Sequence, residues 1–140
     1  MPTEVTAVPA APSDQAERHY AAKLAFETDC DDVHGALAAG TADFVLLDVR
    51  GAGAYARGHV PGAGHLPRRE ISAERLAAIP PTTLLVVYCA GPHCNGADKA
   101  ALALARLGRP VKIMIGGVTG WRDEGFPLAT GTAPGTLAEV

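Results

Sequence analysis

Residues Leu84–Ala97 read LLVVYCAGPHCNGA and hold the strongest strand signal of the chain, followed by the start of its strongest helix. The apolar, β-branched run Leu84–Tyr88 predicts a buried strand, and Asn95 is placed to cap a helix that extends to Leu107. Cys89 thus stands between a strand end and a helix start, where open α/β sheets bind ligands. Backbone N–H groups and the helix dipole favour an anion there, so we expect Cys89 to carry negative charge or covalent cargo.

Strands and helices alternate along the rest of the chain. The run Asp43–Asp48 is nearly all apolar, which is typical of a strand buried on both faces. Further strands are predicted at Gly64–Leu66 and Val111–Ile115, with an extended piece near Phe26 and Glu27, and helices at Ser13–Leu24 (capped by Ser13), Asp31–Ala39, Ala52–Arg57, Ser72–Ile79 and around Trp121. The alternation predicts an α/β fold with a parallel sheet and right-handed crossovers.

Composition and length favour one globular domain. The 140 residues are 48% hydrophobic, and residues 1–12 and 129–140, rich in Ala, Pro and Thr, are predicted flexible tails around a domain at 13–128. A net charge of −3 with scattered basic residues argues against nucleic acid as a partner. No apolar run approaches the ~20 residues of a membrane span, and the N-terminus has no secretory signal pattern. We therefore expect a cytoplasmic protein whose three cysteines are reduced thiols.

Three segments resemble the rhodanese sulfurtransferase family. They are LLDVRGAGAYARGHVPGA (Leu46–Ala63), VVYCAGPHCNGADKAALALARLG (Val86–Gly108) and MIGGVTGWRDEGFPL (Met114–Leu128). Each motif is weak alone, but their order and spacing match the family over most of the chain, roughly from Leu24 to Leu128. The resemblance implies a rhodanese-like α/β fold, with a central parallel sheet of about five strands flanked by helices on both faces.

The resemblance also implies a function. Cys89 would take a sulfane sulfur from a donor, hold it as a persulfide and pass it to an acceptor, which is covalent catalysis of the ping-pong kind. Donors in the family include thiosulfate, glutathione persulfide and protein persulfides, and acceptors include thiols and cyanide; no metal or organic cofactor is implied. The substrate-binding loop would consist of Ala90, Gly91, Pro92, His93, Cys94 and Asn95, and Asp48 with Arg50 would support that loop.

The loop departs from the family pattern at three positions. Pro92, Cys94 and Asn95 stand where Gly, Arg and Ser or Thr are usual. Without the arginine, we expect weaker attraction for thiosulfate, and His93 would replace its charge only in part at neutral pH. Cys94 suggests a second role for the loop: it could form a disulfide with Cys89 or resolve an oxidised or sulfur-loaded Cys89.

Three other functions were weighed. A phosphatase would need a longer loop and an arginine where Asn95 stands. A metal site could use Cys89, His93 and Cys94 with His59 or His65, but this spacing fits no familiar zinc pattern. A non-enzymatic rhodanese module could act as a persulfide or redox sensor, or as a protein-interaction domain, using the Cys89–Cys94 pair. The oligomeric state is left open by the sequence.

Overall fold

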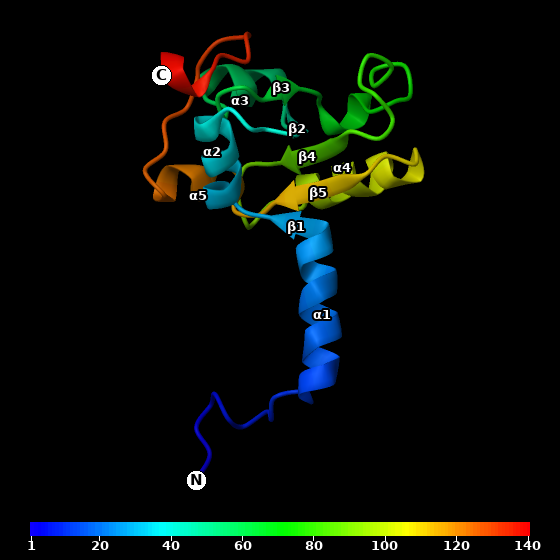
Figure 1. Cartoon of the computed structure of the whole chain (residues 1–140). Coiled ribbons are helices and arrows are strands. Elements are labelled where there is room, and N and C mark those ends of the chain that lie inside the picture. Colours follow the sequence, from blue (N-terminus) through cyan, green and yellow to red (C-terminus); the bar gives the residue numbers. More distant parts are fainter.

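A five-stranded parallel sheet forms the centre of the molecule, as the computed structural model of residues 1–140 shows (Figure 1). The strand order is β1-β5-β4-β2-β3, and every pairing is parallel. The strands are β1 (Glu27–Thr28), β2 (Phe44–Asp48), β3 (Gly64–His65), β4 (Leu84–Tyr88) and β5 (Val111–Met114). This confirms the predicted α/β class and places the long apolar runs, β2 and β4, side by side inside the sheet.

Helices cover both faces of the sheet. The helices α2 (Cys30–Ala39) and α5 (Gly117–Asp123) pack on one face, and α4 (Gly96–Arg106) packs on the other. Side chains alternate between these two cores along each strand: Val86 and Tyr88 of β4 join α2 and α5, whereas Leu85 and Val87 join α4. The short α3 (Ala52–Arg57) follows β2, and 3-10 turns occur at Arg68–Glu70 and Leu137–Glu139.

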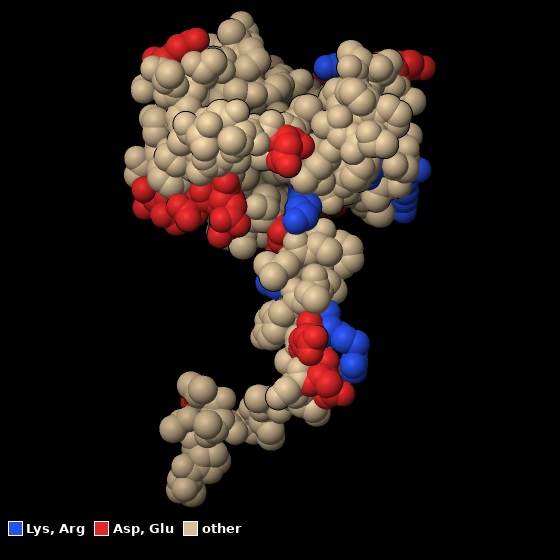
Figure 2. Space-filling view, in the orientation of Figure 1, with Lys and Arg blue, Asp and Glu red and all other residues tan.

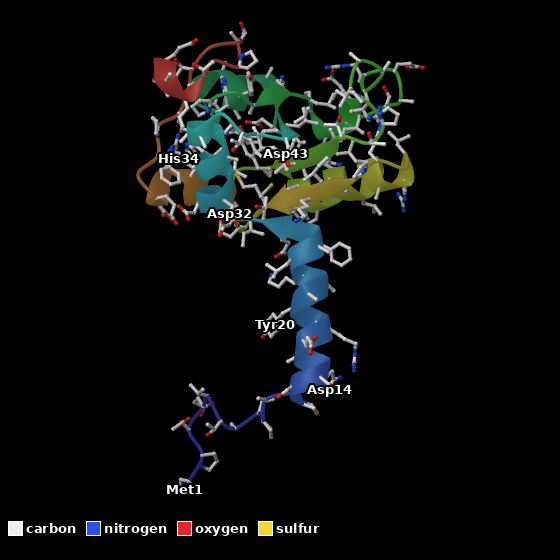
Figure 3. The ribbon with its side chains drawn as sticks, in the orientation of Figure 1. Met1, Asp14, Tyr20, Asp32, His34 and Asp43 are labelled. Carbon is white, nitrogen blue, oxygen red and sulfur yellow. The ribbon has the colours of Figure 1, made fainter.

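Helix α1 (Ser13–Phe26) projects from the domain and buries none of its residues (Figure 1). Tyr20 and Leu24, which lie on its expected apolar face, are 60% and 70% exposed, and Figure 3 shows Tyr20 with no neighbouring element. The expected cap at Ser13 was wrong, because Pro12 precedes the helix and no side chain caps its first amides. None of the helices has the length and apolar character that crossing a bilayer requires.

Two further local predictions were wrong. The segment Ser72–Ile79 forms turns instead of a helix. The Arg109 guanidinium donates hydrogen bonds to three backbone carbonyls in and next to this segment, those of Leu76, Ile79 and Pro80. Asn95 immediately precedes α4 but makes no side-chain cap bond; its backbone carbonyl accepts the Lys99 N–H at 3.1 Å instead. At Ser72–Ile79, tertiary bonds from Arg109 override the local helical preference. Asn95 has φ −92° and ψ 13°, which is not the extended conformation of a capping residue.

The C-terminal segment 129–140, which we expected to be a flexible tail, is hydrogen-bonded to the domain along its first part. Ala129 is buried and exchanges two backbone hydrogen bonds with His59, at 2.9 and 2.8 Å. Farther along, the Pro134 carbonyl accepts the Gly62 N–H at 2.9 Å. These bonds tie the segment to the turn that follows α3.

Candidate active site

Cys89 is the first residue after β4 and opens a loop that leads into α4. The loop covers Cys89–Asn95 and is closed by a turn in which the Cys94 N–H donates to the Gly91 carbonyl at 3.0 Å. Cys89 is 9% exposed, Cys94 is half-buried, and His93 at the tip is exposed. The structure therefore brings the predicted loop residues together, with a buried sulfur at the base and a more accessible sulfur nearer the rim.

The two loop sulfurs lie close together at the start of α4. The Cys94 sulfur accepts the N–H of Gly96 at 3.4 Å. A Cβ on Gly96 would lie 2.8 Å from Cys89 Sγ and 3.3 Å from Cys94 Sγ, so the missing side chain leaves the space that both sulfurs occupy. Glycine at the first position of α4 is thus a condition for this pair.

Of the two loop sulfurs, Cys94 is the one whose thiolate form the surroundings favour. Burial, followed by the hydrogen bond to Cys94, raises the pKa of Cys89 above the ordinary thiol value. The pKa of Cys94 is lowered, first because it accepts the Cys89 thiol and then because it accepts the Gly96 N–H at the start of α4. We expected the helix start to favour a Cys89 thiolate; that expectation was wrong, because Cys94 accepts the first helical N–H and is less buried than Cys89.

The loop also presents hydrogen-bond donors that no protein group uses. The backbone N–H groups of Gly91, His93 and Asn95 have no acceptor within the protein, and Pro92 has no N–H to offer. The Ala90 N–H points to the sulfurs and favours their charged forms. Such clustered amides at a strand-to-helix turn form a ready site for an anion.

The first turn of α5 holds the loop from behind, and this support was not predicted from the sequence. The Val118 N–H donates to the Cys89 carbonyl at 3.2 Å, and the N–H and Oγ1 of Thr119 donate to the Ala90 carbonyl at 3.0 and 3.1 Å. Gly117 allows this approach: at φ +56°, a Cβ there would lie 2.4 Å from the Cys89 carbonyl oxygen. The Gly116–Gly117 pair was the available signal, but it indicated only a turn.

Asp48 and Arg50 support the site less directly than the resemblance implied. Asp48 is fully buried, and the Arg50 side chain donates to its two oxygens at 3.0 and 2.7 Å and to the Gly58 carbonyl at 2.6 Å. Burial works against the charge of Arg50, but bonding to Asp48 outweighs it and raises the pKa of Arg50. Asp48 makes no hydrogen bond to the loop; instead it pairs in the sheet with Tyr88, which directly precedes Cys89.

Two cavities of about 250 Å³ flank the loop. Both sulfurs line the first cavity, whose charged residues are Glu27 and Asp98 only. A neighbouring cavity is lined by Pro92 together with Asp29, Asp31 and Glu124. Figure 2 shows acidic side chains gathered there, where α2 begins and α5 ends. The second cavity lies against Ala90 and Thr119 and is lined by three arginines, Arg50, Arg57 and Arg122.

The comparisons with known proteins assign the family. A model of the rhodanese-like domain matches residues 29–124, which is most of the chain. The chain belongs to the rhodanese-like domain family. A crystal structure of the protein BH2092 from Bacillus halodurans is similar to this chain, with 38% sequence identity and a TM-score of 0.82. The match covers 86% of this chain and 88% of BH2092.

Two curated relatives of this rhodanese-like domain differ in their described roles. A thiosulfate sulfurtransferase, GlpE, from Pseudomonas entomophila is 34% identical over 96 residues, covering 68% of this chain and 78% of the enzyme. An HTH-type transcriptional regulator from Mycobacterium tuberculosis is 37% identical over 93 residues, covering 66% of this chain and 41% of the regulator. The chain therefore spans less than half the length of that regulator.

Three histidines of this rhodanese-like domain have partners other than the loop sulfurs. His59 is buried, with Nδ1 on the Tyr55 carbonyl at 2.8 Å and Nε2 on the Ala133 carbonyl at 3.0 Å. His65 places Nε2 on the Arg50 carbonyl at 2.8 Å. His34, labelled in Figure 3, stacks on Phe126 with the ring centroids 3.8 Å apart. The metal site considered from the sequence lacks its fourth ligand, and no group of three metal-binding side chains is assembled.

Proposed function

We propose that this rhodanese-like domain is a sulfurtransferase that carries sulfane sulfur as a persulfide on Cys89. One observation carries the proposal: Cys89 lines an open cavity together with Gly91, and the backbone N–H groups of Gly91, His93 and Asn95 in the same loop have no protein acceptor. A persulfide anion extending from Cys89 into this loop would accept those N–H groups. The 34% identity to a protein described as a thiosulfate sulfurtransferase supports the same reaction class.

The reaction begins with the proton of Cys89. Cys94 lies beside Cys89 at Gly96 and has the lower pKa of the two, so its ionised form is placed to take the Cys89 proton as a base. The Cys89 sulfur then attacks the outer sulfur of the donor, a new S–S bond forms, and the donor's S–S bond breaks with its electron pair leaving on the donor remnant. In the second half-reaction, a thiol or cyanide acceptor attacks the terminal sulfur and Cys89 departs as thiolate.

The charges around the sulfurs favour one class of donor. The cavity that exposes them contains the carboxylates of Glu27 and Asp98 and no lysine or arginine. Thiosulfate brings a fixed negative charge to the reacting sulfur, whereas a persulfide RS–SH does not. We therefore expect persulfides of small thiols, such as glutathione persulfide, or of proteins to be better donors than thiosulfate. Because all three cysteines are free thiols, we place this reaction in a reducing compartment, the cytoplasm.

A donor panel tests the proposal. The full chain is incubated with thiosulfate, glutathione persulfide or inorganic polysulfide, its intact mass is measured, and turnover with cyanide is then followed. We expect the mass to rise by one sulfur atom, fastest with the persulfide, and Cys89→Ser to abolish both uptake and turnover. The matched control Cys30→Ser should keep both, because Cys30 is 4% exposed and its thiol is bonded to the Ile115 and Gly117 carbonyls. Full activity of Cys89→Ser would sink the proposal.

A second candidate function is a sulfur or redox sensor. The closeness of the two loop sulfurs at Gly96 supports it, as does the match to a transcriptional regulator of which this chain covers 41%. A sensor would take up sulfur in the same panel but would turn over poorly with every acceptor, whereas the sulfurtransferase would cycle.

A further inference from the structure

We propose that Cys94 is a resolving thiol: its sulfur attacks the Cys89 persulfide, expels hydrosulfide and leaves a Cys89–Cys94 disulfide. The inference rests on the proposed function, because it requires sulfur to be loaded on Cys89. It goes beyond that function, because it gives the domain a second activity, the reduction of sulfane sulfur to sulfide at the expense of a dithiol.

The placement of the two sulfurs selects the point of attack. Both lie beside one point, the position of a Cβ on Gly96, at 2.8 Å for Cys89 Sγ and 3.3 Å for Cys94 Sγ. In a persulfide, the atom that stays at this point beside Cys94 is the inner sulfur, Cys89 Sγ, while the added sulfur extends into the cavity that both residues line. Attack on the inner sulfur forms the intramolecular disulfide, whereas attack on the outer sulfur would merely move the cargo to Cys94.

The step balances without any further reactant. The reacting form is the protonated persulfide, Cys89–S–SH. The electron pair of the Cys94 thiolate forms the new bond to Cys89 Sγ, the persulfide S–S bond breaks, and its electrons leave on the terminal sulfur, which keeps its proton and departs as HS⁻. Over uptake and release together, two thiol sulfurs are oxidised to a disulfide while the sulfane sulfur is reduced to sulfide. A dithiol then reduces the disulfide by thiol–disulfide exchange and is itself oxidised to a cyclic disulfide.

The surroundings of Cys94 suit this role. Cys94 is the more exposed sulfur of the pair, and the Gly96 N–H at 3.4 Å stabilises its anion. A Cys89–Cys94 disulfide would close only this short loop, which is already folded back by the hydrogen bond from the Cys94 N–H to the Gly91 carbonyl. Cys30 is no competitor, because it is 4% exposed and its thiol is bonded to the Ile115 and Gly117 carbonyls.

A single-turnover experiment tests the inference. Wild type, Cys94→Ser and the control Cys30→Ser are each loaded with glutathione persulfide and desalted quickly in the absence of reductant. Intact mass and released sulfide are followed with time, and dithiothreitol is then added to count repeated cycles. Serine at position 94 keeps an acceptor for the Gly96 N–H but offers no thiol.

We expect wild type and Cys30→Ser to release one sulfide per chain and to end at the mass of the reduced protein less two hydrogen atoms, with the disulfide mapped to positions 89 and 94. Cys94→Ser should keep its added sulfur at least about a hundredfold longer, since a neighbouring thiol has an effective concentration of ~10⁵ M or more in favourable cases. With dithiothreitol, wild type should cycle faster than Cys94→Ser.

The opposite outcomes are distinct from one another. If wild type keeps its persulfide as long as Cys94→Ser, or if the added sulfur is found on Cys94 without sulfide release, the resolving role is overturned while the proposed sulfur transfer stands. If no variant that retains Cys89 takes up sulfur, the proposed function itself fails and the inference fails with it.

Discussion

Replacing Gly117 by alanine should break the contact between α5 and the cysteine loop. Gly117 has φ +56°, a conformation that L side chains rarely adopt. Its Cβ would lie 2.4 Å from the Cys89 carbonyl oxygen, 2.9 Å from the Gly91 nitrogen and 3.0 Å from the Ala90 carbonyl carbon. All three are backbone atoms, so no flexible side chain can move aside, and either the loop or α5 must shift.

The expected cost follows from these contacts. A left-handed conformation costs a non-glycine residue ~1–2 kcal/mol. A shift also removes the two backbone hydrogen bonds from the Val118 and Thr119 N–H groups to the Cys89 and Ala90 carbonyls, each a net contribution of ~0.5–1.5 kcal/mol. We therefore expect Gly117→Ala to lower the free energy of unfolding by about 2–5 kcal/mol and to slow sulfur uptake by Cys89, because the loop amides lose their positions.

Gly125→Ala is the matched control. Gly125 also has a positive φ, +80°, but nothing lies within 4 Å of its Cβ position. It should therefore lose only the conformational part, ~1–2 kcal/mol, and keep sulfur uptake. Urea unfolding measures the stabilities, and intact mass after incubation with glutathione persulfide measures uptake. Equal losses of stability in the two variants, with uptake unchanged in Gly117→Ala, would refute the proposed bracing of the loop by α5.

Three other predictions concern the buried ion pair, the thiols and α1. Asp48→Asn leaves the Arg50 guanidinium, which is 12% exposed, without its carboxylate and should lower the free energy of urea unfolding by about 3 kcal/mol or more. The control Glu70→Gln breaks an ion pair whose side chains are both about half exposed and should cost less than ~1 kcal/mol. Similar losses in the two variants would contradict a stabilising role for the buried pair. As the pH is raised, iodoacetamide should label Cys94 below the pH needed for an ordinary thiol, Cys89 only at higher pH, and Cys30 last, because burial raises the pKa of Cys30 to about 11. Fragmentation mass spectrometry gives the order of labelling. Labelling of Cys89 before Cys94 would show that Cys89, not Cys94, ionises more readily. Deleting residues 1–24 removes no buried side chain and should change the unfolding free energy by less than ~1 kcal/mol; a loss of several kcal/mol would show that α1 supports the domain.

The strands and the position of Cys89 were predictable because their signals are local. The apolar runs of β2 and β4 are typical of strands buried on both faces, and the alternation of elements implied the parallel sheet. The helix predicted at Ser72–Ile79 failed because Arg109, distant in sequence, bonds the carbonyls of this region and holds it in turns. Propensity carries no information about such a partner.

The charge of the loop was less predictable than its position. A helix start stabilises an anion in general, but which of two thiols benefits depends on sub-ångström placement: Cys94, not Cys89, accepts the Gly96 N–H. Likewise, Arg57 and Arg122 are far apart in sequence and come together only because α3 and α5 both end near the loop residue Ala90. Both features arise from tertiary packing.

Locating the sulfur on the chain tests persulfide transport by Cys89 most directly. Cys94→Ser is loaded with glutathione persulfide at alkaline pH, where Cys89 ionises without Cys94 as its base, and is then alkylated, digested with trypsin and fragmented. The peptide Leu76–Lys99 carries Cys89 as its only cysteine, and Leu24–Arg50 carries Cys30. We expect one added sulfur atom on Cys89 and none on Cys30. Sulfur on Cys30, or no added sulfur on either peptide while the protein remains folded, would overturn the proposed function.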